Sequence, residues 1–345
     1  MRWALWGLVL SLVGYAGLAA TGRWTVLGEL ASQFRFLFGF AALASAGLFA
    51  VARHRRKAGV AILLALWGSW PEGSLFLGPD APSIATEAAL VTALSGAQRS
   101  APSSDLGRPA FQMISCNVLR PNARYDEVFN VLLKSEPDVI GLLECSEEWR
   151  DAALRRLLPK YPYYAVASNT PDWSEHTWAL MLFSKTEFTS TEVLRLDFKD
   201  WELRPVLQVT LAEPLDLTIT LAHPERPGRP ARMRARRTAL ESIAASDVQG
   251  NWLVIGDLNS TSTSPLFGDL IEATGLRDSR AGFGRLPSWG FGNRLPGPIP
   301  IPLPPRPRIS VAIDHALVSQ GLEVLDRQTL YVPGSDHRAV SVTLR

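Results

Sequence analysis

The chain has 345 residues, enough for one large domain or two small ones, and a formal net charge of +2 at pH 7. This near-neutral balance gives no indication of a charged partner. The two cysteines exclude a disulfide framework and a cysteine-rich metal site. Hydrophobic residues make up 47% of the sequence, and their excess lies almost entirely before residue 80. The average composition therefore describes two different regions joined in one chain.

Three apolar runs occupy the first 79 residues: Trp3–Gly22, Phe36–Ala52 and Ala58–Leu77. The first two contain no charged residue, and the third contains only Glu72. About 20 such residues span a bilayer as a helix. A signal peptide is the alternative for the first run, but a cleaved leader would not be followed by two further membrane-length runs. We therefore expect an all-α membrane anchor of three transmembrane helices over residues 1–79, with a hairpin plus an interfacial third segment as the alternative.

The charges between these runs predict an orientation. The loop before the third run is strongly basic, and its residues are Arg53, His54, Arg55, Arg56 and Lys57. The loop before the second run carries only Arg23, Glu29 and Arg35. Because positive loops stay in the cytoplasm, the N-terminus and the 53–57 loop are expected inside, with everything after residue 80 in the periplasm or cell exterior of a bacterial inner or plasma membrane. Should the third run fail to cross, the C-terminal region faces the cytoplasm instead.

Residues 80–109 are rich in Pro, Ser, Gly and Ala, which is typical of a linker. From residue 110 to 345, short β-rich segments alternate with a few helical ones. Helices are predicted over 125–135 and 229–245, and Ser264-Pro265 is typical of a helix start. Strands are predicted at 111–118, 138–144, 163–167, 178–184, 192–198, 205–211, 217–222, 252–259, 309–318, 322–331 and 339–344. Many strands with few helices predict an α/β fold, a two-layer β-sandwich flanked by helices.

Polar residues recur at the downstream ends of the apolar strands, the edge at which α/β folds place their sites. Asn117 and Glu144 end the first two strands, and His223 follows the strand at 217–222. Asp257 and Asn259 end a later strand with alternate spacing, so both side chains point to the same face. We expect these strands to belong to one sheet layer, which would bring the polar groups together.

Two further groups continue the pattern, because Asp314 interrupts an apolar run and Asp336-His337 precedes the final strand. Singly, such residues are more often caps, turns or satisfied core pairs; as a set they indicate a site. Carboxylate and amide oxygens without cysteine suit Mg²⁺, with Mn²⁺ as an alternative, rather than Zn²⁺. Hydrolysis of a phosphate ester needs a metal ion, a group that orients water and cations for the developing charge.

The order of these motifs resembles the endonuclease/exonuclease/phosphatase superfamily, whose DNase I-like members include nucleases, inositol polyphosphate 5-phosphatases and neutral sphingomyelinases. The resemblance covers nearly all of residues 110–345, and the apolar N-terminus is similar to a bacterial, membrane-anchored subgroup. Many members carry Gln before the metal-binding Glu, where this chain has Leu143. The matching pieces are I-S-C-N (114–117), P-D-V-I-G-L-L-E (137–144), L-A-H-P (221–224), V-I-G-D-L-N-S (254–260), I-D-H (313–315) and S-D-H (335–337).

The resemblance implies a role for each matching position. Glu144 would be the principal metal ligand, helped by Asn117 and Asp336. Asp257 would orient or deprotonate the attacking water, and Asn259 would hold a phosphate oxygen.

The resemblance also implies roles for two imidazoles. His337 would contact the phosphate as a charged donor, with Asp314 fixing its ring. His223 would be the second imidazole facing the phosphate and would assist the leaving group. Attack of water in line then yields a phosphomonoester and an alcohol without a covalent enzyme intermediate.

Two features bear on the substrate. Trp289, in the loop before the Asp314 motif, is a candidate for stacking on a base or lying against lipid, and a rigid surface loop is the alternative. An arginine-rich stretch follows His223, typical of contact with a polyanion or of a solvated helix face. Its members are Arg226, Arg229, Arg232, Arg234, Arg236 and Arg237.

Four hypotheses follow for the function. A metal-dependent nuclease or phosphodiesterase comes first, and a membrane-facing phospholipid or sphingomyelin phosphodiesterase is the alternative. A catalytically inactive phosphate-binding scaffold is disfavoured because every expected polar position is filled. A transporter is excluded because the apolar runs lack paired charges.

The expected partners are a phosphate-ester substrate, from nucleic acid or a lipid headgroup, and the bilayer; no protein partner is inferred. Cys116 and Cys145 flank the proposed metal ligands, and free buried thiols are favoured over a bridge that would strain the site.

Overall fold

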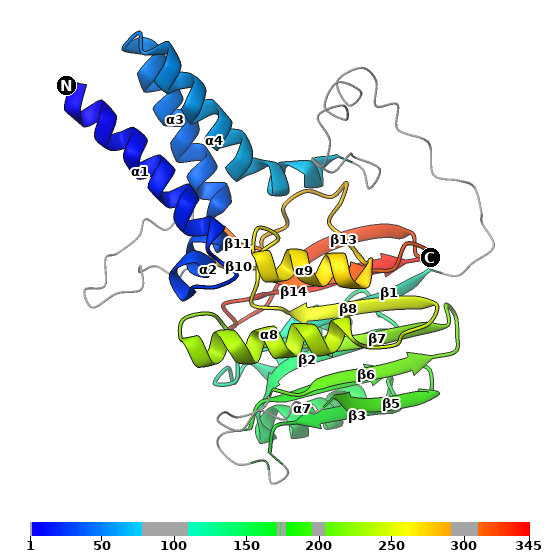
Figure 1. Ribbon diagram of the computed structural model, residues 1–345. Coiled ribbons are helices and arrows are strands. Elements are labelled where there is room, and N and C mark those ends of the chain that lie inside the picture. The colour runs from blue at the N-terminus through cyan, green and yellow to red at the C-terminus, as the bar shows by residue number, and fades with distance from the viewer. Residues whose placement is uncertain (1, 78–109, 171–172, 174–176, 195–203, 291–309) are drawn as a thin grey trace.

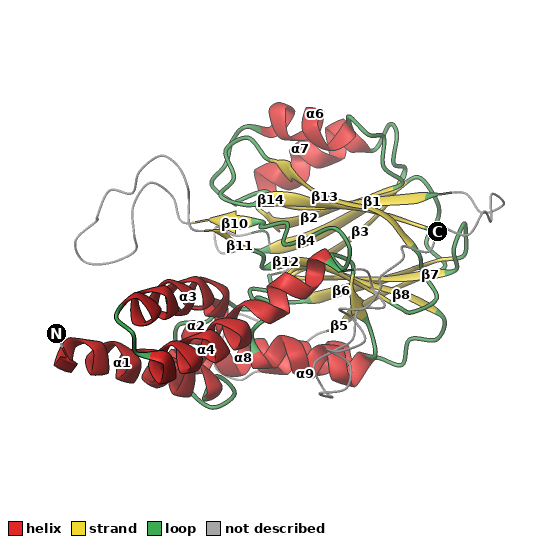
Figure 2. Cartoon of the chain, turned by 90° about the horizontal axis from the view of Figure 1, so that it is seen from above, coloured by secondary structure: helices red, strands yellow, loops and turns green. Residues whose placement is uncertain are grey.

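The computed structural model describes residues 2–77, 110–170, 173, 177–194, 204–290 and 310–345. The expected linker at 80–109, the end of the strand expected at 192–198 and the proline-rich stretch after residue 290 lie outside these residues. Within the described residues the C-terminal region contains two six-stranded sheets packed face to face. Helices cover the outer face of each sheet, as the view in Figure 2 shows. The α/β sandwich predicted from the sequence is therefore confirmed at the level of its layers.

The first sheet has the order β13-β14-β1-β2-β4-β3. Its strands are β1 (Phe111–Asn117), β2 (Val139–Cys145), β3 (Tyr163–Ser168), β4 (Ala179–Ser184), β13 (Val324–Tyr331) and β14 (Arg338–Leu344). Helices α6 (Tyr125–Leu133) and α7 (Glu147–Leu157) lie on its outer face. The sequence predicted each of these strands to within a few residues, but α7 was not expected.

The second sheet has the order β5-β6-β7-β8-β12-β9. Its strands are β5 (Ser190–Leu194), β6 (Val206–Leu211), β7 (Leu217–Ala222), β8 (Asn251–Asp257), β9 (Arg277–Asp278) and β12 (Asp314–Val318). Helices α8 (Pro230–Ala244) and α9 (Pro265–Thr274) cover its outer face. A short pair, β10 (Trp289–Gly290) and β11 (Ser310–Val311), lies at the edge of the sandwich.

The central strands are apolar on both sides because each has a sheet on one face and a helix on the other. Every residue of β7 is buried, and this explains its nearly continuous run L-T-I-T-L-A. Met113 and Ile255, from opposite sheets, belong to the core between the layers. Leu143 is fully buried in the same core. Its side chain, which stands where many relatives carry Gln, therefore serves packing here.

Two parallel strand pairs fix the position of the functional edge. β1 pairs with β2 in the first sheet, and β7 pairs with β8 in the second. The carboxyl ends of these strands meet at one edge of the sandwich. The expectation that the site groups end strands of a single layer was wrong, because the two sheets contribute to the edge equally. A strand-end pattern shows the direction of a strand but not the sheet to which it belongs.

The N-terminal region is helical and projects from the sandwich, as Figure 1 shows in blue. Its elements are α1 (Arg2–Ala20), α2 (Val26–Gln33), α3 (Arg35–Val51), α4 (Arg55–Gly73) and a 3-10 turn, η1 (Ser74–Phe76). Small residues allow α3 and α4 to approach closely: a Cβ added at Gly68 would meet the Cα of Gly39 at 3.0 Å. The outward faces carry apolar side chains, with Leu10 and Leu63 each 68% exposed.

The apolar runs expected at 3–22, 36–52 and 58–77 correspond to α1, α3 and α4. Among the residues described, length and apolarity do not suffice for any individual helix to cross a bilayer. The bent pair of α2 and α3, which meet at 68°, satisfies both criteria when taken together. The loop expected at 23–35 is mostly the short helix α2, which packs on the sandwich rather than running free.

Candidate active site

A glycine brings β7 and β8 unusually close where the site begins. Gly256 has φ 138°, and a Cβ built on it would lie 2.1 Å from the carbonyl oxygen of Ala222. A side chain at this position would separate the two strands. Because Asp257 and His223 directly follow these two residues, the close approach also sets the distance between the carboxylate and the imidazole.

Two residues of the site have left-handed backbone conformations, which non-glycine residues rarely adopt. Glu144 has φ 62°, and the pairing of β2 with β4 is irregular between Leu142 and Cys145. Asn259 has φ 50°. Strained backbone of this kind concentrates at functional sites, where it aims side chains away from the regular strand direction. Here the two strained residues belong to the motifs at 137–144 and 254–260, which the sequence predicted to carry site groups.

The carboxylates of Glu144 and Asp257 are joined by one amide. Asn117 donates from Nδ2 to Glu144 Oε1 at 2.9 Å and to Asp257 Oδ2 at 3.2 Å. Its own oxygen accepts from the backbone of Leu119 at 3.1 Å. Asn259 donates its backbone N–H to Asp257 Oδ1 at 2.9 Å. The structure thus brings together three of the residues expected to form the site and connects them to the Asn259 turn.

His223 lies between the same carboxylates and is nearly buried. Its Nε2 is 3.4 Å from Asp257 Oδ2 and 3.7 Å from Glu144 Oε1. Nη1 of Arg204 lies 2.8 Å from the same ring nitrogen. Arg204 is held in turn by Glu225, to which its Nε donates at 2.8 Å. An arginine that the sequence analysis did not single out therefore lies against the expected phosphate-facing imidazole.

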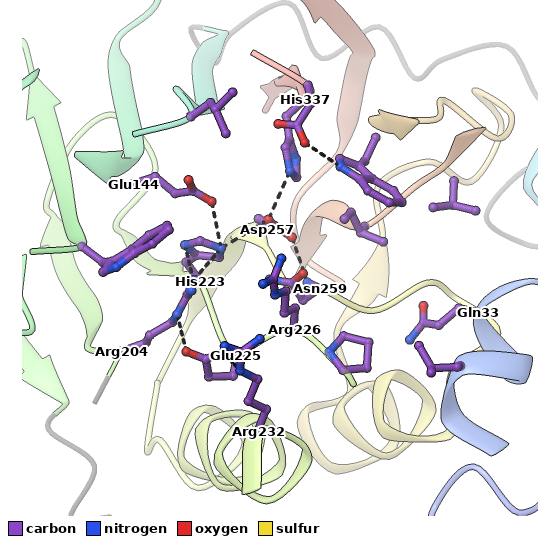
Figure 3. A pocket seen from close by; sticks show the side chains of 18 of the residues that line it. Gln33, Glu144, Arg204, His223, Glu225, Arg226, Arg232, Asp257, Asn259 and His337 are labelled. Atoms are coloured by element: carbon purple, nitrogen blue, oxygen red, sulfur yellow. Dashed lines mark hydrogen bonds and ion pairs between the residues drawn. The ribbon is translucent and has the colours of Figure 1, made fainter. Parts of the chain in front are cut away.

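His337 approaches Asp257 from the opposite side (Figure 3), with its Nε2 3.6 Å from Asp257 Oδ2. Its Nδ1 lies 2.8 Å from Asp314 Oδ2, the pairing that the motif order implied. Burial lowers the pKa of His337, but the carboxylates of Asp314 and Asp257 outweigh that effect and raise the pKa to about 10. Burial likewise raises the pKa of Asp257, yet His337 and His223 hold it well below its usual value. The site therefore contains an ionised carboxylate beside a protonated imidazole at neutral pH.

The remaining expected residues lie at the mouth of the same pocket. Asp336 is exposed, and its Oδ2 accepts from Nε1 of Trp289 at 3.0 Å. Trp289 also forms an isolated β-bridge with His337. Asn259 donates from Nδ2 to the carbonyl of Pro224 at 3.0 Å. Asp336, Trp289 and Asn259 all line the cavity, but Asp336 is not among the groups whose ligand atoms lie within 4.8 Å of one another.

The cavity has a volume of about 660 Å³ and includes residues that sequence reasoning missed. Trp178, directly before β4, lies with its ring centroid 4.7 Å from the guanidinium carbon of Arg204. Neither residue stands in a recognisable motif, so only the three-dimensional structure places them at the site. Further wall residues come from α2, namely Leu30, Gln33 and Phe34.

Donor groups in this pocket fit a hard divalent cation. The ligand atoms of Glu144, His223 and Asp257 lie within 4.8 Å of one another. Those of Asp257, Asp314 and His337 are equally close, but a protonated His337 offers no nitrogen lone pair to a metal, so the first group is the better candidate. Cys116 and Cys145 are buried, free thiols, and burial raises the pKa of each. Neither cysteine belongs to a candidate ligand group among the described residues, although both adjoin site residues, and the choice of free thiols over a bridge is confirmed. Carboxylate oxygens are the donors that hard divalent cations prefer.

The arginine-rich stretch divides between the two uses considered for it. Arg226 and Arg232 line the cavity, and Arg232 Nε is 3.6 Å from Glu225 Oε2. Arg236 is fully buried and forms an ion pair with Glu29 of α2. The stretch is therefore neither a uniform polyanion patch nor a solvated helix face.

Comparison with known proteins is consistent with this geometry. Residues 112–337 match the model of the "Endonuclease/Exonuclease/phosphatase family". The chain belongs to this family. Family members hydrolyse phosphate ester bonds, and this endonuclease/exonuclease/phosphatase-family protein is an enzyme of that class. A comparison of its sequence with curated proteins gives no match.

Solved structures share the fold at low sequence identity. An endonuclease/exonuclease/phosphatase from Beutenbergia cavernae is 18% identical with a TM-score of 0.55, covering 69% of this chain and 72% of its own. D. rerio TDP2 complexed with a single-strand DNA product is 14% identical with a TM-score of 0.52, covering 68% and 99%. A mannosyl-6-phosphatase from Bacteroides thetaiotaomicron is 15% identical with a TM-score of 0.52, covering 68% and 99%. The family protein described here thus has the family fold over its C-terminal region, while α1 to α4 lie outside the matched residues.

Proposed function

We propose that this chain is a Mg²⁺-dependent phosphodiesterase that uses water as the nucleophile, with Mn²⁺ able to replace Mg²⁺. The observation that carries the proposal is the convergence of Glu144, Asp257, His223 and His337 within hydrogen-bonding or near-contact distances at one edge of the sandwich. These residues are scattered over almost 200 positions of the sequence, so their meeting is not a consequence of local structure. An inactive scaffold would not need to maintain this complete set.

Glu144 would be the principal ligand of the cation, with Asn117 and Asp336 assisting from the two sides of the pocket. Asn117 holds Glu144 and Asp257 together through its amide, an arrangement that keeps the carboxylate positioned. When bound, the cation would polarise the phosphate ester and offset its developing negative charge.

Asp257 would orient the attacking water, because it stays ionised while its second oxygen is fixed by the backbone of Asn259. Protonated His337 would donate to a phosphate oxygen, with Asp314 holding its ring in place. His223 and Asn259 would contact other phosphate oxygens, and His223 would assist departure of the alcohol. Water oxygen then joins phosphorus as the ester P–O bond breaks, and the leaving oxygen receives the proton.

Anchoring in a bilayer is part of the proposal. The bent pair of α2 and α3, which together are long and apolar enough to reach across a membrane, supports the anchoring. The basic turn at 53–57 lies at the end of α3 and α4 far from the sandwich (Figure 1). This separation supports a cytoplasmic turn and a catalytic region on the periplasmic or outer side.

A periplasmic alkaline phosphatase reporter fused after residue 100 should be active, and activity of a cytoplasmic reporter at the same position would contradict the orientation.

Metal dependence tests the reaction. Full-length protein in detergent should hydrolyse bis(4-nitrophenyl) phosphate with Mg²⁺, and EDTA should lower the rate about 100-fold or more because the developing charge loses its largest counter-charge. Added Mg²⁺ or Mn²⁺ should restore it. A rate that EDTA leaves unchanged would contradict the proposed role of the cation.

A further inference from the structure

Helix α2 is fastened to the catalytic sandwich by buried polar contacts. Glu29, fully buried, forms an ion pair with Arg236 and accepts from Ser264 Oγ at 2.7 Å. Gln33 Oε1 accepts from the backbone N–H of Thr261 at 2.6 Å. Removing one partner of a buried ion pair leaves the other charge buried without compensation, which is strongly destabilising. Such contacts hold α2 in one place on the sandwich.

The same contacts lead directly to the site. Arg236, besides pairing with Glu29, donates from Nη1 to the carbonyl oxygen of Asn259 at 2.6 Å. Thr261 lies two residues beyond Asn259 in the loop between β8 and α9. The position of α2 is therefore coupled to the loop that carries Asp257 and Asn259.

The opposite face of α2 is apolar and forms part of the pocket. Leu27, Leu30 and Phe34 follow one another at spacings of three and four residues, so they lie along one side of the helix and its end. Leu30 and Phe34 line the catalytic cavity, while Leu27 is 67% exposed. This α2 stripe, Leu27–Leu30–Phe34, thus runs from the pocket wall to the outer surface.

The N-terminal helices expose further apolar side chains, and the end of α1 packs against α2. Leu18, at the end of α1, and Phe76, in η1, are 41% and 66% exposed at the sandwich end of this bundle. Val311 and Ile313 add apolar groups to the cavity on its other side. The lining of the cavity therefore combines the charged groups of the site with apolar side chains.

We propose that the α2 stripe is a second, apolar half of the substrate site, and that the substrate is a phosphodiester carrying a hydrocarbon chain. The inference rests on the proposed phosphodiesterase function and on the bilayer anchoring. The phosphate lies among Glu144, Asp257, His223 and His337, and the chain lies along the stripe toward the bilayer. Water attacks phosphorus, one ester P–O bond breaks, and a phosphomonoester and an alcohol leave.

A matched pair of chromogenic esters tests this inference. 4-Nitrophenyl hexadecyl phosphate and 4-nitrophenyl methyl phosphate share a leaving group and differ in the chain. Full-length enzyme in detergent micelles with Mg²⁺ should show a kcat/KM at least about tenfold higher for the hexadecyl ester, since the methyl ester lacks the chain that contacts the stripe. Leu30→Gln should lower the ratio of the two kcat/KM values about tenfold. Leu27→Gln, at a largely exposed position that folding tolerates, should lower the ratio by a smaller factor.

Partition of the long ester into micelles is the same for every variant and cancels in the comparison. Leu325→Gln, an exposed apolar position on β13 far along the chain from α2, is the matched control and should leave both rates unchanged. An equal ratio in wild type, Leu30→Gln and Leu27→Gln would overturn the inference while leaving the phosphodiesterase intact. A single-stranded oligodeoxynucleotide cleaved faster than both esters would also overturn it, in favour of nucleic acid. Absence of hydrolysis of every ester by wild type would refute the proposed function itself.

Discussion

The sandwich and the N-terminal helices use apolar side chains in opposite ways. In the sandwich, residues such as Ile219 and Ile255 are completely buried between the sheets. In the helices, Leu10, Leu63 and Val51 are 68%, 68% and 84% exposed. Large exposed apolar surfaces of this kind mark sites of interaction with a membrane or another protein. The difference teaches that the two regions are built for different surroundings although one chain contains both.

The boundary between the two regions is polar instead. Glu29 forms an ion pair with Arg236, and Glu72 Oε2 lies 3.0 Å from Arg285 Nε. Both carboxylates are buried. Buried charges are tolerated when they are paired and hydrogen-bonded. The boundary therefore fixes the helices in a defined position rather than merely attaching them, and this position is next to the catalytic loop.

Removal of a buried charge at the boundary should have the largest effect. Glu29→Ala leaves Arg236 buried without its partner, and we expect a loss of about 3–5 kcal/mol in the free energy of unfolding. Thermal unfolding of the purified full-length protein measures the change. Asp269→Ala is the matched control, because its ion pair with Arg23 is about half exposed and contributes at most about 1 kcal/mol. Equal shifts for both variants would mean that the boundary is not a rigid junction.

Substitutions inside the site should separate activity from stability. Asp257→Ala and His337→Ala should each lower kcat about 100-fold or more, because each removes a group placed on the reacting phosphate or water. Steady-state hydrolysis of bis(4-nitrophenyl) phosphate provides the measurement. Asp247→Ala, at an exposed position after α8, should retain wild-type rates. Rates near wild type in both site variants would rule out the assigned roles.

A charge on the projecting helices should have the smallest effect. Leu63→Lys places a cation on the exposed apolar face of α4, where a bilayer disfavours it. We expect a several-fold larger share of the protein in the soluble fraction after a carbonate wash, with complete release prevented by the other helices. Leu325→Lys, on the exposed side of β13, should not change the distribution. An equal change in the soluble fraction for both variants would contradict the distinction between the surface of the N-terminal helices and that of the sandwich.

Local patterns in the sequence were sufficient for much of the sandwich. The strand periods placed β7 at the residues observed, and the motif order placed Asp314 beside His337. These successes have a common cause, because burial on both faces of a strand and polar groups at its end produce a sequence pattern within a few residues. The assignment of all site groups to one sheet failed because such a local pattern contains no information about which strands pair.

Long-range partners explain the other omissions. Glu29 read as one charge of a loop, yet its partner Arg236 is 207 residues away and the two are buried together. Arg204 has no motif around it, and its place beside His223 depends on the pairing of β6 with β7. Helix α2 has eight residues, too few for its apolar spacing to be distinguished from a loop. Each of these groups acquires its function from the fold rather than from its neighbours in sequence.

Binding of Mn²⁺ to the full-length protein, followed by electron paramagnetic resonance, tests the central claim most directly. The wild-type protein should bind Mn²⁺, and Glu144→Gln should weaken the affinity about tenfold or more because the principal carboxylate ligand is lost. Glu147→Gln, a half-exposed neighbour on α7, should bind as the wild type does. Equal affinity in Glu144→Gln and wild type would contradict the convergence of these groups on one cation.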